Sequence, residues 1–191
     1  MKYLTILATI FLFSSCSRQP AQQPPQSSTS KSTASNNYEK NVSLALNVVP
    51  ASGETASDFS WYDSNGKKVS LSDLKGKTVL INFWATWCGP CKAELPYIEA
   101  VSKEYASKGL VVIGVSVDKG NNLLNDVSSF AAANGLTYQI VIDNDDVAEA
   151  YGNINAIPTS FLVNKDGKIV DKWIGTRDKA FFEATVEKYL E

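Results

Sequence analysis

The sequence has 191 residues, of which 44% are hydrophobic and 20% are charged, and this is the composition of an ordinary globular protein with one main domain. A formal net charge of −2, without a segment of clustered Lys and Arg, argues against nucleic acid as a partner. Because histidine is absent, histidine-based acid–base catalysis and most zinc ligand sets are excluded. The chemistry must therefore be sought among three cysteines, Cys16, Cys88 and Cys91.

Residues 1–16 have the pattern of a leader peptide, with one lysine, an apolar run over residues 3–13 and two serines before Cys16. A helix over this run would be too short to cross a membrane, which favours export. The small residues before Cys16 resemble the lipobox of bacterial lipoproteins, although Phe13 stands where that motif usually has leucine. The resemblance implies that Cys16 is acylated and anchors the protein to a lipid membrane. A plain secreted protein is the alternative.

Residues 17–52 are expected to form a disordered polar tether. No Val, Ile, Leu or aromatic residue occurs over residues 17–37, so this segment has little with which to offset the entropy of ordering. The folded domain is therefore expected over residues 53–191.

The pattern of the folded part predicts an α/β protein. It opens with a β-hairpin, because segments 58–63 and 67–71 flank an Asn-Gly turn. The apolar run 78–85 indicates a strand buried on both faces, and an amphipathic helix follows over about 90–107, where Pro96 should bend it. The remaining expected elements are strands at 110–117, 137–142, 159–164 and 168–175, and helices at 123–134, 145–152 and 179–189. Alternating strands and helices predict a mixed sheet with helices on both faces.

Three structural roles compete with redox catalysis for Cys88 and Cys91. A zinc site lacks further good ligands, because there is no second CxxC motif and no histidine. Attachment of a c-type haem needs histidine where Lys92 stands. A purely structural disulfide that closes so short a loop would constrain the unfolded chain very little.

A redox pair accounts for the spacing of the two cysteines. Residues three apart on a helix share a face, so the two sulfurs can reach each other. Cys88 would lie at the helix N-terminus, where free N–H groups and the helix dipole favour a thiolate. Cys88 is therefore the expected attacking sulfur, and Cys91, one turn inside, is expected to resolve the mixed disulfide. Pro90 suits the first helical turn because it lacks an N–H.

Two segments carry a resemblance to thioredoxins. Residues 87–92, WCGPCK, resemble the thioredoxin active site, and residues 156–163, AIPTSFLV, resemble its second signature. The match implies a cis Ile157-Pro158 peptide beside Cys88, where the backbone would meet an extended substrate segment. An ordinary trans proline that opens a strand is the alternative. The residues that the match places around the cysteines are Trp87, Gly89, Pro90, Ile157 and Pro158.

More closely, the chain resembles the TlpA/ResA-like branch of anchored extracytoplasmic thioredoxins, from about residue 54 to the C-terminus. The features are the N-terminal hairpin, the unit 70–96 and an extra helix and strand between about 119 and 142. The implied fold is thioredoxin-like, with a central mixed sheet flanked by helices, an N-terminal β-hairpin and a central helix–strand insertion. The implied protein is a monomer without cofactor or metal.

The resemblance also implies a place for a catalytic carboxylate. Cytoplasmic thioredoxins have a buried carboxylate where this chain has Asn82, and an amide cannot take a proton. Glu94 matches the glutamate that the TlpA/ResA-like branch places near its cysteines. We therefore expect Glu94 to help deprotonate Cys91. The alternative is a solvated glutamate on the outer face of the helix. Trp84 and Trp87 are expected to pack the core and cover the disulfide.

The implied activity is thiol–disulfide exchange in the cell envelope, on a periplasm-facing membrane or the outer face of the cytoplasmic membrane. Nothing in the sequence supplies the large thiolate stabilisation of a strong oxidant, so a reductase or weakly reducing exchanger is expected. Its partners would be oxidised exported proteins, including apocytochrome c, and a membrane-embedded thiol electron donor. Two rival functions are a non-catalytic binding module and a thiol peroxidase, whose Pro and Thr are replaced by Ile81 and Ala85.

Overall fold

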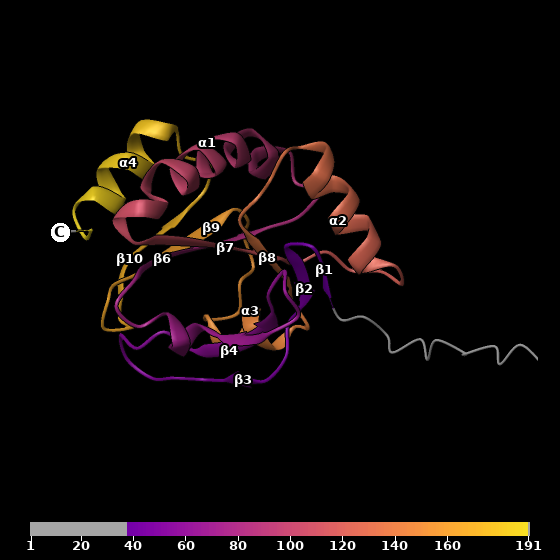
Figure 1. Cartoon of the computed structure of the whole chain (residues 1–191), viewed down its shortest axis with the longest axis horizontal. Helices are drawn as coiled ribbons and strands as arrows, with labels where there is room; N and C mark the ends of the chain where they lie inside the picture. Colours follow the sequence, from indigo (N-terminus) through magenta and orange to yellow (C-terminus); the bar gives the residue numbers. More distant parts are fainter. Residues whose placement is uncertain (1–37, 191) are drawn as a thin grey trace, which may run out of the picture. The chain divides into compact units, whose positions relative to one another are not determined.

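The structure is a computed structural model that describes residues 38–190 (Figure 1). The predicted leader, the lipidation site at Cys16 and most of the predicted tether lie outside these residues. Within the described range, no helix combines the length and the apolar character that a membrane span requires.

A seven-stranded mixed sheet forms the centre of the domain. Its strands, in spatial order, are β1 (Tyr38–Glu39), β2 (Val42–Leu44), β8 (Gln139–Ile142), β7 (Leu110–Ser116), β6 (Thr78–Trp84), β9 (Thr159–Val163) and β10 (Ile169–Ile174). Strands β2, β8, β7 and β6 run parallel, whereas β1, β9 and β10 pair antiparallel with their neighbours. Strand β6, in the interior of the sheet, is buried at all seven positions, as its largely apolar run predicts.

Helices and a small second sheet cover the two faces of this central sheet (Figure 1). The elements on one face are α1 (Gly89–Tyr105), α2 (Leu123–Ala133) and α4 (Lys179–Glu187). Those on the other face are α3 (Asp146–Ala150) and the antiparallel sheet of β3 (Val48–Val49), β4 (Asp58–Tyr62) and β5 (Lys68–Ser70). Two short 3-10 helices, η1 (Leu71–Leu74) and η2 (Ala106–Lys108), complete the elements of the described part.

The central sheet separates two hydrophobic cores, because successive side chains of β6 point to opposite faces. Leu80 and Trp84 pack with Leu95 of α1 in the helix-covered core. Ile81 and Phe83 pack in the other core, beneath α3 and the small sheet. The domain is therefore the α/β fold with a mixed sheet that the sequence predicts.

The predicted start of the fold at residue 53 is wrong. Strands β1 and β2 precede it and extend the central sheet beyond β8, and β3 joins the small sheet. Val42 is buried, and the Asn41 side chain donates to the carbonyl oxygens of Leu136 and Tyr138 at 3.2 and 2.6 Å. These strands have only two or three residues, and β2 pairs with β8, which lies far along the chain, so the sequence pattern did not reveal them.

The predicted N-terminal hairpin is confirmed by the strand pairing. Strands β4 and β5 are antiparallel and flank the Asn-Gly turn, although they belong to the separate small sheet. Strands β9 and β10 are antiparallel, with a register shift between Ile169 and Asp171. Helix α4 ends at Glu187, two residues earlier than expected, while Phe182 and Val186 are buried as expected.

Candidate active site

The cysteine pair lies where β6 leads into α1. A short turn after β6 brings Cys88 to the N-cap of α1, and its N–H donates to the carbonyl oxygen of Ala85 at 3.1 Å. Gly89 and Pro90 form the first helical positions. Pro90 lacks an N–H, but this costs no hydrogen bond because the N–H groups of the first turn have no partner within the helix. The helix begins one residue before the predicted start, and its Cys91 N–H reaches the Cys88 sulfur.

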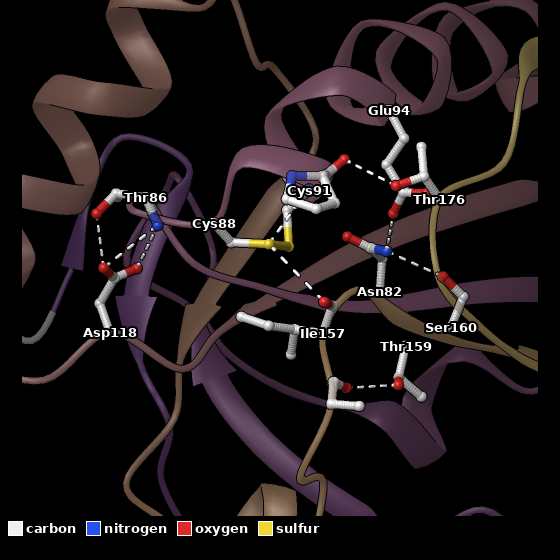
Figure 2. The surroundings of a disulfide bond; sticks show 12 residues. Asn82, Thr86, Cys88, Cys91, Glu94, Asp118, Ile157, Thr159, Ser160 and Thr176 are labelled. Carbon is white, nitrogen blue, oxygen red and sulfur yellow. Dashed lines mark hydrogen bonds between the residues drawn. A yellow bond between two sulfur atoms is a disulfide. The ribbon is translucent and has the colours of Figure 1, made fainter.

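The two cysteines are joined by a disulfide and differ in exposure (Figure 2). The Sγ atoms are 2.05 Å apart, and the backbone N–H of Cys91 donates to the Cys88 Sγ at 3.1 Å. Cys88 is 5% exposed, whereas Cys91 is fully buried. An incoming sulfur can therefore approach only Cys88, and this exposure and the N-cap position both suit an attacking thiolate.

A cis-proline segment lies directly against the cysteine pair. The Ile157-Pro158 peptide is cis, as the resemblance implied, and the carbonyl oxygen of Ile157 lies 3.9 Å from the Cys88 Sγ (Figure 2). The Thr159 hydroxyl donates to the Ala156 carbonyl at 2.7 Å, which fixes this turn before β9. Backbone polar groups are thus presented beside the sulfur that a substrate must reach.

Glu94 is buried one helical turn after Cys91, so it is not the solvated surface residue of the alternative interpretation. Its Oε1 accepts from the Asn82 Nδ2 at 2.9 Å, and its Oε2 accepts from the backbone N–H of Arg177 at 3.0 Å. Burial raises the pKa of Glu94 to about 7, although these two donors and the Arg177 charge act in the opposite direction. A carboxyl with this pKa can both accept and release a proton near neutral pH.

The turn before Cys88 is held by Asp118, a residue that the sequence did not single out. The buried Asp118 carboxylate accepts from the Thr86 N–H at 3.0 and 3.2 Å and from the Thr86 hydroxyl at 2.6 Å. It also accepts from the Ser116 hydroxyl at 2.7 Å. The sequence did contain a signal for Asp118, because polar residues that follow a buried parallel strand meet at the carboxyl edge of the sheet, where sites form.

The segment between β10 and α4 closes the site from the other side. The Gly175 N–H donates to the Pro158 carbonyl at 2.8 Å. The Thr176 hydroxyl, labelled in Figure 2, donates to the Pro90 carbonyl at 3.0 Å. Arg177 adds the backbone hydrogen bond to Glu94. One loop therefore binds the cis-proline turn, the start of α1 and the Glu94 carboxyl. No sequence motif indicated the role of this loop.

The two tryptophans near the cysteines have different surroundings. Trp84 is fully buried and packs against Phe130, as expected for a core residue. Trp87 is 67% exposed, so the expectation that it packs into the core is wrong. The Trp87 side chain therefore lies largely in solvent, one residue before Cys88 in the chain. Across residues 38–190, no group of three Cys, Asp or Glu side chains could hold a metal ion.

The fold and the site together define a thiol–disulfide oxidoreductase. A thioredoxin-like sheet places a cysteine pair at a helix N-terminus, beside a cis-proline, with a carboxyl buried behind the second cysteine. This arrangement suits disulfide exchange through a mixed disulfide.

Known proteins that resemble this chain in sequence or in structure are named as thiol–disulfide oxidoreductases or interchange proteins. Residues 51–190 match the family model described as Redoxin, and the chain therefore belongs to the Redoxin family. The thiol-disulfide oxidoreductase ResA of Bacillus subtilis (strain 168) is 41% identical over 125 residues, covering 65% of this chain and 68% of ResA. That of Bacillus anthracis is 39% identical over 137 residues, covering 71% and 77%. A solved thiol:disulfide interchange protein from Chlorobium tepidum TLS, of the thioredoxin family, is 32% identical with a TM-score of 0.64, covering 76% of this chain and 99% of its own.

Proposed function

We propose that this oxidoreductase reduces disulfides in exported proteins outside the cytoplasm, and that acylated Cys16 anchors it to a lipid membrane. The proposal rests on the different solvent exposure of the two cysteines. Cys88 caps α1 and is the more exposed sulfur, whereas Cys91 and Glu94 are fully buried behind it. An attacking sulfur must be reached by another protein, while the resolving sulfur and its base work best where water is excluded.

The reaction proceeds in two exchanges. The Cys88 thiolate attacks one sulfur of the substrate disulfide, so that a Cys88–substrate bond forms and the other substrate sulfur leaves as a thiolate. The Glu94 carboxylate then takes the proton of Cys91, and the Cys91 thiolate attacks the Cys88 sulfur. The Cys88–Cys91 disulfide forms, the second substrate thiolate leaves, and two electrons have passed to the substrate.

The backbone beside the cis-proline would align the substrate. The Ile157 carbonyl lies close to the Cys88 sulfur, so an extended segment that pairs with this backbone would bring its disulfide to Cys88. The substrate class implied by the resemblance is oxidised exported protein, including the CxxCH sites of apocytochrome c. A membrane-embedded thiol donor would re-reduce the enzyme, because an oxidising compartment does not do so.

Trapping the mixed disulfide tests the function. In Cys91→Ala, Cys88 can attack but the product cannot resolve, so covalent complexes with exported proteins should accumulate and be identified by mass spectrometry after reduction. Cys88→Ser is the matched control and should give no complexes and no turnover. A binding module would keep its function in Cys88→Ser, and a peroxidase would turn over peroxide; either result would refute the proposal.

The role of Glu94 has a separate test. In Glu94→Gln, the side chain keeps its shape but cannot take the Cys91 proton, so release of a preformed Cys88 mixed disulfide should slow by roughly 10²-fold or more near neutral pH. Alkylation of Cys88 by iodoacetamide should be nearly unchanged, because the attacking thiolate does not depend on this base. Equal rates of release in the two proteins would rule out Glu94 as the base.

A further inference from the structure

Asn82 occupies the middle of β6, directly beneath α1, and is fully buried. Its amide nitrogen donates two hydrogen bonds, to the Glu94 Oε1 and to the Ser160 Oγ, both at 2.9 Å. Its carbonyl oxygen is also buried, yet it has no hydrogen-bond partner among residues 38–190. Buried acceptors without a donor are rare in native proteins, so this oxygen needs an explanation.

The two partners of the amide nitrogen fix which way the side chain faces. When Glu94 is ionised, an exchange of nitrogen and oxygen would place the Asn82 oxygen against the Glu94 Oε1. Two acceptors would then face each other. The Asn82 oxygen must therefore point away from Glu94 and Ser160, along the third direction of the amide group.

That direction leads to the cysteine pair. Leu80 and Trp84, two positions before and after Asn82 on β6, share one core with Cys91. Figure 2 shows the Asn82 oxygen on the side of the amide that faces the disulfide, while the nitrogen faces Glu94 and Ser160. In the disulfide neither sulfur carries a hydrogen, so neither can donate. Reduction gives Cys91 an S–H group, which is a donor.

We propose that Asn82 is a positioning residue for the resolving cysteine: its carbonyl oxygen accepts the thiol hydrogen of Cys91 in the reduced enzyme and loses this donor when the disulfide forms. Reduction by a dithiol adds two electrons and two protons to the pair, and the proton on Cys91 is the one that Asn82 binds. On resolution this proton passes to Glu94, which the same amide holds through its nitrogen. The inference rests on the proposed role of Cys91 as the resolving sulfur.

The reduction potential tests this inference directly. Asn82→Leu has a similar shape without the oxygen, so the reduced form should lose its extra hydrogen bond and the disulfide should become harder to reduce. The equilibrium constant for oxidation by glutathione should rise about tenfold, which corresponds to about 30 mV for a two-electron couple. Asn82→Ala removes the same oxygen and should give the same direction of change if the leucine variant does not fold.

Two controls separate this effect from a change at Glu94. Ser160→Ala removes a partner of the amide nitrogen and leaves the oxygen in place, so the equilibrium constant should change less than about twofold. In a Glu94→Gln background, Asn82→Leu should still produce about the same tenfold change. If the change disappears in that background, it acts through Glu94, and the inference is wrong.

Infrared spectroscopy measures the S–H stretching band of Cys91, which should not change if Asn82 has only a structural role. With Cys16→Ser and Cys88→Ser, Cys91 is the remaining thiol, and its S–H stretching band should lie at lower frequency with Asn82 than with Asn82→Leu. The inference is wrong if neither the S–H band nor the reduction potential changes. It is also wrong if the reduction potential shifts in the opposite direction, which would mean that the amide N–H of Asn82 faces Cys91. The proposed function would be unaffected by these outcomes, because its own tests are the trapping of substrate by Cys91→Ala and the loss of activity in Cys88→Ser.

Discussion

At the scale of single residues, Glu94 shows how burial and hydrogen bonding compete at one carboxyl. Removal from water disfavours its ionised form, while the Asn82 amide, the Arg177 N–H and the Arg177 charge favour it. Burial has the larger effect and raises the pKa to about 7. The same residue that would take a proton from Cys91 therefore makes folding sensitive to pH.

The direction of this pH dependence follows from the two pKa values. The folded pKa of about 7 lies above the ordinary value of 4.5, so the contribution of Glu94 to stability is fully present below about pH 4.5 and is lost as pH rises through about 7. Glu94→Gln removes this loss. We therefore expect the variant to gain on the order of 2 kcal/mol relative to the native protein between pH 5 and pH 8, measured by urea unfolding of the oxidised forms.

Glu99→Gln is the matched control for this measurement. Although burial acts in the opposite direction, hydrogen bonds from Lys103 and Thr137 hold the pKa of Glu99 below its ordinary value. Glu99 is therefore largely ionised at both pH 5 and pH 8, and the effect of its substitution should be nearly the same at the two pH values. A similar pH-independent difference for Glu94→Gln would contradict the raised pKa.

At the scale of elements, the active site is assembled from the ends of strands and the loops that follow them. Residues 85–87 after β6, Asp118 after β7 and the loop before α4 meet around the first turn of α1. Each loop is short and bonded to a neighbour, so the positions of Cys88 and Trp87 depend on contacts between distant parts of the chain.

Substitution of Asp118 should loosen the turn that carries Trp87. Asp118→Ala leaves the Thr86 N–H and two hydroxyl groups without their acceptor, at a cost of about 2–3 kcal/mol. The Thr86 amide should exchange its hydrogen faster, and reduction of a protein disulfide should slow more than reduction of a small disulfide. Asp126→Ala, on the exposed side of α2, is the control and should change neither. Unchanged exchange at Thr86 would contradict the role assigned to Asp118.

The sequence predicted those elements whose evidence is local. The run that became β6 and the Cys-x-x-Cys spacing at the start of α1 each lie within a few residues, and so does the Asn-Gly turn of the hairpin. Asp118, Thr176 and Arg177 were missed because their partners lie about 30 to 90 residues away and because their own neighbours are ordinary loop residues. Pairing with a distant segment, β8, is also what places β2 in the central sheet.

At the scale of the whole molecule, the N-terminal strands complete one edge of the central sheet. Strand β2 pairs in parallel with β8, and Val42 is buried against the helix-covered core. Without β2, the polar backbone of β8 would become an open edge, which is a site for pairing with another chain. The folded unit therefore includes strands that start at Tyr38, fifteen residues before the predicted boundary.

Truncation tests where the domain begins. A chain that starts at residue 53 should be less stable than one that starts at residue 37 by at least about 2 kcal/mol, because it loses the burial of Val42 and the Asn41 hydrogen bonds. Urea unfolding followed by tryptophan fluorescence measures the difference, and light scattering should show self-association of the shorter chain. Equal unfolding midpoints would mean that β1 to β3 do not belong to the cooperative unit.

The central sheet divides the interior into two cores, and this division affects where mutations can change the protein without disturbing the cysteine pair. Cys88, Cys91 and Trp84 all belong to the core beneath α1, whereas the core beneath α3 contains none of these residues. Mutations that accumulate on the α3 side would alter shape and surface there, while the electron-transfer chemistry is shielded by a full layer of backbone. A new recognition surface could therefore be engineered on that side without retuning the sulfur pair.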